Sequence, residues 1–317
     1  MENINFTFPA MGSTVNIQAS VPNTVLPYLE TDIKNLWAQY EQACSRFIPN
    51  NALAKVNSNL KEWVEAPKEL IAVIKEAYKA YLSTKGAFDP RILKSLTNAG
   101  YIHSFSLGRP TPNLVNAPKT ETILIREIWQ PEFKDTSVYI GNIPIDLGGI
   151  AKGYTVTKTA EFLSHYTNNF IVNGGGDIYL SGFTPEKDKW RIGIENPFNK
   201  DLDPIAVIRT TNMGVATSSI SKRYWADETG KKLHHIINPQ TGLPADSGVM
   251  SVTVVAPHTF DAEVMTKTLF LQKPDQIAQI THEKEIPALW VTDEGQIFYS
   301  IHLLPFLEWL NGEHITR

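Results

Sequence analysis

Between residues 170 and 257 the chain carries short apolar runs separated by turn-forming residues, among them FIVNGGGDIYLSG, KWRIGIENP, PIAVIRTT and MSVTVVAP. Short apolar runs bounded by Gly, Pro, Asn and Asp are typical of β-strands. Strands this numerous and this closely spaced favour an α+β fold over a doubly wound parallel sheet. The pattern therefore predicts mixed or antiparallel sheets with packed helices.

The remainder of the chain mixes both kinds of element. Further strands are expected as a pair over residues 4–20 around Met11-Gly12, in TILIREIW, in SVYIGNIPIDL with a turn at Gly141-Asn142, and in a final hairpin of ALWVTD and QIFYSI. Helices are expected over about residues 26–40, 68–84 and 260–271, and a further helix is expected to begin at about residue 150. Gly86 is expected to end the helix over 68–84. Residues 98–120 are rich in Pro, Asn, Ser and Gly, which predicts a surface loop rather than a linker, so residues 1–317 are expected to form a single domain.

Composition narrows the classes of function. The 317 residues are 42% hydrophobic and 20% charged, which is enough for a sizeable core. A formal net charge of -4 and the lack of any Lys/Arg-rich run argue against nucleic acid as a partner. The single cysteine, Cys44, excludes an internal disulfide, and its helical spacing with Trp37 and Tyr40 predicts a buried hydrophobe.

The N-terminus lacks a basic region followed by an apolar one, and no apolar run is long enough to span a bilayer. A cytoplasmic protein is the expectation. An exported or lipid-anchored form trimmed of its leader would look the same.

The stretch IDLGGIAKGYTVTKTAEF places glycines and Lys152 between an expected strand and an expected helix. Backbone N–H groups at such a helix start can hold a phosphate. The stretch is not a Walker loop, because Gly153 and Tyr154 follow the lysine where Ser or Thr is needed, and it does not match GxGxxG. Taken alone, it is a glycine-rich turn with a solvated lysine.

Several other short motifs accompany this stretch: MGST, SRFIPNNALAKVN, FDP, NGGGDI, GVATSS, HHIINPQTG and SVTVVAP. In this order the motifs resemble the ApbE family, the FAD:protein FMN transferases, from MGST at residue 11 to TLFL ending at residue 271. The resemblance implies an α+β fold of two lobes around a cleft that binds FAD. It also implies transfer of FMN from FAD to a Thr or Ser hydroxyl of an acceptor protein, with release of AMP and the help of Mg²⁺.

The resemblance assigns roles to particular residues. Met11, Phe47, Ala87, Phe88 and Asp89 are expected to line the flavin or adenosine pockets, Asp146 and Lys152 to touch the dinucleotide, the Gly149 carbonyl to face the metal, and His234, His235 and Ile236 to lie near the cofactor. The catalytic candidates are Lys267, Glu263, Asp89 and His235. Asp89 or Asp146 is expected to orient the acceptor hydroxyl or the ribose.

The chain departs from the family in FDAEVMTKTLFL. There the family has an aspartate and, four residues later, a threonine that bind Mg²⁺, whereas this chain has Glu263 and Lys267. Gly149, Glu263 and Thr266 remain as oxygen donors, but a lysine ammonium repels a metal ion. Residues four apart share a helix face, so Glu263 and Lys267 can pair, and Lys267 can supply the positive charge itself.

Two smaller departures from the family pattern also suggest a weakened metal site: this chain has Thr157 and Asn238 at positions where the family commonly has an acidic residue. The sequence favours loss or weakening of the metal site over a normal Mg²⁺ site.

Three classes of function therefore stand at this point. The first is a flavin transferase. The second is an FAD-binding protein without transferase activity, as a flavin carrier or a slow FAD pyrophosphatase. The third, a nicotinamide-dependent oxidoreductase, rests on the glycine-rich turns alone and lacks the dinucleotide fingerprint.

Overall fold

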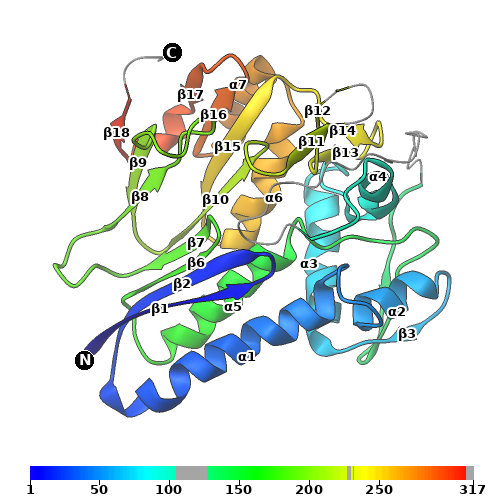
Figure 1. Ribbon diagram of the computed structural model, residues 1–317, viewed down its shortest axis with the longest axis horizontal. Coiled ribbons are helices and arrows are strands. Elements are labelled where there is room, and N and C mark those ends of the chain that lie inside the picture. Colours follow the sequence, from blue (N-terminus) through cyan, green and yellow to red (C-terminus); the bar gives the residue numbers. More distant parts are fainter. Residues whose placement is uncertain (105–126, 227–229, 231, 312–317) are drawn as a thin grey trace.

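A central sheet of eight strands, which runs through the middle of the molecule in Figure 1, organises the fold. The computed structural model describes residues 1–104, 127–226, 230 and 232–311. The sheet has the order β1-β2-β6-β7-β10-β15-β16-β17, and each neighbouring pair is antiparallel. Its strands are Glu2–Ala10, Ser13–Val21, Phe170–Gly174, Asp177–Ser181, Met213–Ser219, Val249–Ala256, Ala288–Thr292 and Ile297–Tyr299. The predicted α+β fold with antiparallel sheets is confirmed.

The hairpin of β1 and β2 turns on two residues, because Ala10 is paired with Ser13. Met11 and Gly12 have φ angles of 50° and 66°. Two-residue hairpin turns of this kind need positive φ at both positions, so a methionine here accepts a conformation that favours glycine. The strand pair predicted around Met11-Gly12 is confirmed, and its turn points to the cavity described below.

Helices cover one face of the sheet. They are α1 (Leu26–Cys44), α5 (Ala151–Ser164), α6 (Thr259–Phe270) and α7 (Pro274–Glu283). α1 and α5 bury Ile33, Trp37 and Val156 against β1, β2 and β6, while α6 contacts β10 and β15. Figure 1 shows α1 running beneath the N-terminal hairpin towards α2 and α3. Cys44 ends α1 in a buried position, as predicted.

A smaller sheet covers part of the opposite face. It has the order β18-β9-β8, with strands Leu307–Leu310, Ala206–Thr210 and Trp190–Ile194. Ile208 and Trp190 of this sheet share a core with Leu180 and Val291 of the central sheet.

A second group of elements forms the other lobe. Its helices are α2 (Ala52–Ser58), α3 (Lys68–Ser83) and α4 (Leu93–Asn98), and its sheet, β3-β5-β4, comprises Val64–Glu65, Ser137–Tyr139 and Glu132–Phe133. Gly86, with a φ of 80°, follows the end of α3 and donates its N–H to the Tyr81 carbonyl, so it serves as the predicted stop. One core joins this lobe to the start of α5 through Ile145, Leu147 and Tyr154, which supports the proposal of a single domain.

Short elements complete the described chain. They are η1 (Asn23–Val25), η2 (Pro90–Ile92), η3 (Ile301–Leu303), the pair β11 and β12 (Tyr224–Ala226 and Lys232–His234), and the pair β13 and β14 (Ile237–Asn238 and Leu243–Pro244). None of the helices placed by the structure is long and apolar enough to cross a bilayer.

Two expectations from the sequence differ from the structure. A strand was expected in TILIREIW, but its residues 127–129 form no strand, and its other residues lie outside the described part of the chain. Most of the loop expected over residues 98–120 also lies outside the described part. In SVYIGNIPIDL only Ser137–Tyr139 is a strand, because the chain leaves the small sheet after Tyr139 and continues towards α5. Gly141, with a φ of 89°, lies at the predicted turn.

Candidate functional site

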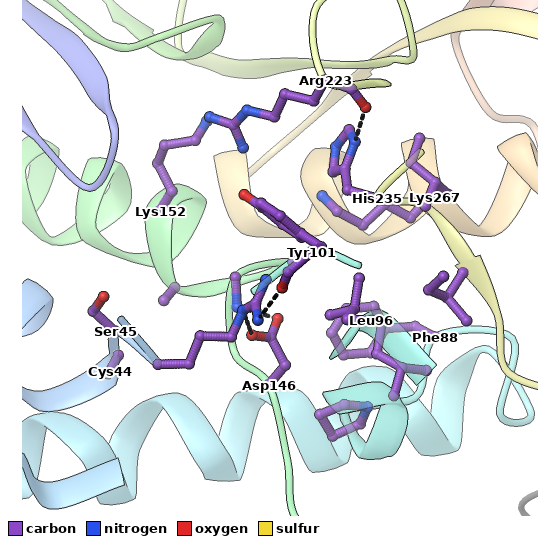
Figure 2. Close-up of a pocket in the computed structure, with 18 of the residues that line it drawn as sticks. Cys44, Ser45, Phe88, Leu96, Tyr101, Asp146, Lys152, Arg223, His235 and Lys267 are labelled. Carbon is purple, nitrogen blue, oxygen red and sulfur yellow. Dashed lines mark hydrogen bonds and ion pairs between the residues drawn. The ribbon is translucent and has the colours of Figure 1, made fainter. Parts of the chain in front are cut away.

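A cavity lies between the two lobes and is partly open to solvent. Ligand pockets occur preferentially where two such packed units meet. Its wall comes from the β1–β2 turn, the end of α1, the segment before η2, the start of α5, the loop after β12, and α6. Figure 2 shows Tyr101 in the middle of the pocket, between Asp146 on one side and Lys152, Arg223 and His235 on the other.

The predicted residues come together here with three exceptions. The wall contains Met11, Phe47, Ala87, Phe88, Asp89, Asp146, Gly149, Lys152, His235, Ile236 and Lys267. His234, Glu263 and Thr266 lie behind the lining. The roles of all these residues stay predictions.

Asp146 supports the glycine-rich loop from within. Its Oδ1 accepts the Gly148 N–H at 2.9 Å, and its Oδ2 is 2.9 Å from Arg46 Nε. Burial raises the pKa of Asp146, and the Arg46 guanidinium opposes that rise. Because this carboxylate already accepts one of the loop's N–H groups, the phosphate cradle expected from DLGGIAKG is partly occupied by the protein itself.

Arg46 lies on two aromatic rings of the cavity wall. Its guanidinium carbon is 4.2 Å from the Phe47 ring centroid and 4.3 Å from that of Tyr101, and its Nη1 donates to the Tyr101 carbonyl at 2.7 Å. Such cation–π contacts hold a guanidinium flat against a ring. The side chain is 8% exposed, and its Nη2 has no hydrogen-bond partner among the residues described.

Asp89 is held by its neighbour Arg91. The Oδ2 of Asp89 is 2.7 Å from Arg91 Nη2, and its Oδ1 accepts the Arg91 N–H and Nε–H at 2.9 and 3.0 Å. Both side chains are 4% exposed. In this arrangement Asp89 fixes the turn into η2, so the structure gives it a structural task in addition to its place in the cavity wall.

Lys152, in the first turn of α5, forms an ion pair with Asp177 at the start of β7. The lysine side chain is 16% exposed and that of the aspartate 4%. Burial raises the pKa of Asp177, while Lys152 opposes that rise and Glu263 adds to it. The lysine that the sequence alone would leave in solvent is therefore anchored at the cavity wall with a buried counter-charge.

Glu263 and Lys267 form the second such pair, as their spacing predicted. Lys267 Nζ is 3.1 Å from Glu263 Oε1 and 3.3 Å from the Glu263 carbonyl oxygen, and Glu263 Oε2 accepts the Gly153 N–H at 2.9 Å. Glu263 is 3% exposed, whereas the Lys267 side chain is 23% exposed and lines the cavity. A buried carboxylate in α6 thus presents an ammonium group to the cavity.

These donors do not fit a hard divalent ion. Mg²⁺ is held in octahedral geometry by one or two carboxylates together with water and substrate phosphates, so it needs a carboxylate oxygen that is open to it. Here both Glu263 carboxylate oxygens accept hydrogen bonds from Lys267 and Gly153, and the Thr266 hydroxyl contacts Ser218 Oγ at 2.7 Å and the Glu263 carbonyl at 2.8 Å. No group of three His, Cys, Asp or Glu residues suited to a metal occurs in the described part of the chain.

The two histidines of HHIINPQTG differ in position. His235 lines the cavity, and its Nδ1 is 3.3 Å from the Arg223 carbonyl. His234 lies behind the lining, with Nε2 2.9 Å from the Ala245 carbonyl and its ring edge against Phe270. Burial lowers the pKa of His234, and burial together with Arg223 lowers that of His235 well below its usual range, so both rings are neutral at pH 7.

The sequence did not indicate Arg46, Tyr101 or Arg223 as site residues. Arg46 and Tyr101 are 55 residues apart, and only the fold places them together. The adjacent Phe47 in SRFIPNN was the one signal that could have pointed to Arg46. Arg223, whose Nη2 donates to the Gly12 carbonyl at 3.4 Å, follows the GVATSS motif by four residues.

Comparison with known proteins agrees with this geometry. A sequence model described as the ApbE family matches residues 11–290. The chain belongs to the ApbE family.

Curated relatives cover nearly the whole chain. A protein of Vibrio cholerae named FAD:protein FMN transferase is 27% identical over 96% of this chain and 93% of its own length. One of Haemophilus influenzae with the same name is 26% identical over 94% of this chain and 89% of its own.

Solved structures share the fold. The ApbE protein of Thermotoga maritima superposes with a TM-score of 0.81, at 26% identity, over 97% of this chain and 100% of that one. The flavin transferase ApbE of Vibrio cholerae superposes with a TM-score of 0.76, at 24% identity, over 96% of this chain and 99% of that one.

Proposed function

We propose that this ApbE-family chain is an FAD:protein FMN transferase, which moves FMN from FAD to a Thr or Ser hydroxyl of an acceptor protein and releases AMP. The observation that carries the proposal is one cavity that presents Lys152, Lys267 and Arg223 together with the neutral imidazole of His235. Cations and a base around one cavity are the parts that phosphoryl transfer requires.

The bond changes balance without any oxidant or reductant. The acceptor hydroxyl oxygen attacks the phosphorus on the FMN side of the pyrophosphate, and a new P–O ester bond forms. The P–O bond to the bridging oxygen breaks, and AMP leaves with that oxygen. The hydroxyl proton goes to a base of the protein.

His235 is the base that the geometry favours. An oxygen of a backbone carbonyl can only accept, so the 3.3 Å contact with the Arg223 carbonyl places the proton of the neutral ring on Nδ1. Nε2 then carries the lone pair. The lowered pKa of His235 keeps the ring unprotonated at neutral pH, so Nε2 has a lone pair for the hydroxyl proton, and the same shift makes the ring a weaker base than a solvated histidine.

Lys152 and Lys267 stabilise the negative charge that develops on AMP, the leaving group, as the P–O bond breaks. Lys152 is held by Asp177 and Lys267 by Glu263, so both ammonium groups have fixed positions before the substrate binds. Preorganised charges of this kind need no rearrangement during the reaction. Met11 and Phe47 offer apolar surface to the flat rings of FAD.

The test is to incubate the protein with FAD and an acceptor domain that the Vibrio cholerae transferase modifies, and to measure the acceptor by intact-mass spectrometry. We expect the mass of FMN on the acceptor with wild-type protein, and a loss of about 100-fold or more in rate for His235→Asn, as for removal of a general base. His282→Asn, at an exposed site in the last turn of α7, is the matched control. Tight FAD binding without any transfer would instead assign the chain to flavin carriage.

A further inference from the structure

We propose that the Lys267 ammonium is the fixed counter-charge for the FAD pyrophosphate in this chain, in place of a divalent ion, so that FAD binding here requires no metal. The inference rests on the proposed function, since it takes FAD as the occupant of the cavity. It concerns how this chain holds the dinucleotide, and binding can be measured whether or not transfer occurs.

The position of Lys267 supports this role. Its Nζ has three N–H donors, and among the residues described Glu263 Oε1 and the Glu263 carbonyl accept two of them, at 3.1 and 3.3 Å. The third donor remains for a ligand in the cavity that Lys267 lines. The charge of Lys267 also influences the pKa values of Asp146, Asp177 and His235, which places it centrally among the ionisable groups of the site.

Glycines give the Lys267 side chain its room. A Cβ atom on Gly149 would lie 3.3 Å from both Cδ and Cε of Lys267, and 3.3 Å from Cε2 of Phe88. These distances are shorter than comfortable carbon contacts of about 3.5–4.0 Å. The lysine stem therefore lies directly over the Gly149 backbone, and any larger residue there would push it away.

The first turn of α5 fixes Glu263, the carboxylate partner of Lys267. Glu263 Oε2 accepts the Gly153 N–H, and a Cβ atom on Gly153 would lie only 2.7 Å from that oxygen. Glu263 is thus clamped between the first turn of α5 and Lys267. Because its Oε1 already faces the ammonium, a divalent ion at that oxygen would have to displace Lys267 or tolerate a like charge at close range.

The charges of the site suit the ligand. The pyrophosphate of FAD carries two negative charges, and Lys267, Lys152 and Arg223 all reach the same cavity wall. Each lysine is held by a buried acid, which fixes the position of its ammonium group at the cavity wall.

The first test measures the FAD dissociation constant by flavin fluorescence in EDTA and in millimolar MgCl₂. We expect tight binding in EDTA and no tightening by Mg²⁺ beyond about twofold. Lys267→Met, which keeps the stem over Gly149, should weaken binding in EDTA by about 10- to 100-fold, as for loss of one hydrogen bond between charged groups. Lys267→Arg should bind much more tightly than Lys267→Met.

A matched control comes from α1. Lys34 and Glu30 form an i,i+4 pair at 2.5 Å with side chains 45% and 50% exposed, so Lys34→Met removes a lysine from the same spacing away from the cavity. This variant should bind FAD like the wild type. Circular dichroism shows whether each variant is folded, and if Lys267→Met is not, the comparison of EDTA with Mg²⁺ on the wild type decides alone.

The second test restores the metal-binding pattern of the family with Glu263→Asp together with Lys267→Thr. We expect this double variant to bind FAD weakly in EDTA and at least about tenfold more tightly in MgCl₂, the reverse of the wild type. Wild-type binding that needs Mg²⁺, or a Lys267→Met variant that binds like the wild type, would overturn the inference. Metal-independent FAD binding without transfer would leave it standing while refuting the proposed function.

Discussion

Replacing Gly153 with alanine tests the close packing of α5 against α6 on which the site depends. The added Cβ would lie 2.7 Å from Glu263 Oε2, 3.0 Å from the Phe260 Cα and 3.2 Å from the Phe260 N. Two of these atoms belong to backbone and cannot rotate away. To accommodate the methyl group, either the helices separate or Glu263 turns and loses the Gly153 N–H at 2.9 Å.

The magnitude follows from three contributions. Overpacking a tight contact costs about 1–3 kcal/mol, and a buried carboxylate that loses a hydrogen bond costs about 1–3 kcal/mol. Alanine in place of glycine inside a helix returns about 1 kcal/mol. We therefore expect Gly153→Ala to lower the free energy of unfolding by about 3 kcal/mol, and to weaken FAD binding because Lys267 loses its fixed partner.

Urea unfolding followed by tryptophan fluorescence measures this change. The Glu263→Ala background is the control, because it removes the nearest of the three contacts while leaving the Phe260 backbone in place. The cost of Gly153→Ala should be smaller there. A Gly153→Ala protein as stable as the wild type, or more stable, would show that the helices are not packed as closely as these distances indicate.

Two further variants test the turn and the histidines. Met11→Gly should leave the stability of the fold unchanged or raise it by up to about 1 kcal/mol, because Met11 has a φ of 50°, a conformation that glycine adopts more easily. The same change should weaken FAD binding, because the Met11 side chain lines the cavity. Melting temperature measures the first effect and FAD titration the second. His235 has a pKa below its usual 6.5 in the folded chain, so the unfolded state takes up protons first and the free energy of unfolding should fall as pH drops below about 6.5. His235→Asn should show a shallower fall in urea unfolding between pH 7.5 and 5, and an identical slope would contradict the burial of a neutral ring.

Local patterns were enough to predict much of the fold. The hairpin at Met11-Gly12, the Gly86 stop and the Glu263–Lys267 pair each depend on residues within a few positions of one another. Such features follow from backbone conformation and helix spacing, which neighbouring residues largely determine.

Contacts between distant segments could not be predicted in this way. Lys152 pairs with Asp177, 25 residues away, and Arg46 pairs with Asp146, 100 positions further along the chain. The sequence placed Asp146 and Lys152 near the dinucleotide but indicated neither pairing. Their burial makes pairing necessary, but burial is set by the whole fold rather than by the sequence around them. The sequence did not predict helix α7 for a different reason. Only two of its residues, Ile277 and Thr281, are buried, so its apolar pattern is short.

The most direct test of the proposed transferase counts products. FAD, the protein and an acceptor domain are incubated in EDTA, and AMP, free FMN and FMN-bearing acceptor are quantified in the same sample. The account predicts one AMP for each modified acceptor, with no accumulation of free FMN. AMP and free FMN in equal amounts with an unmodified acceptor would contradict it and show a pyrophosphatase instead.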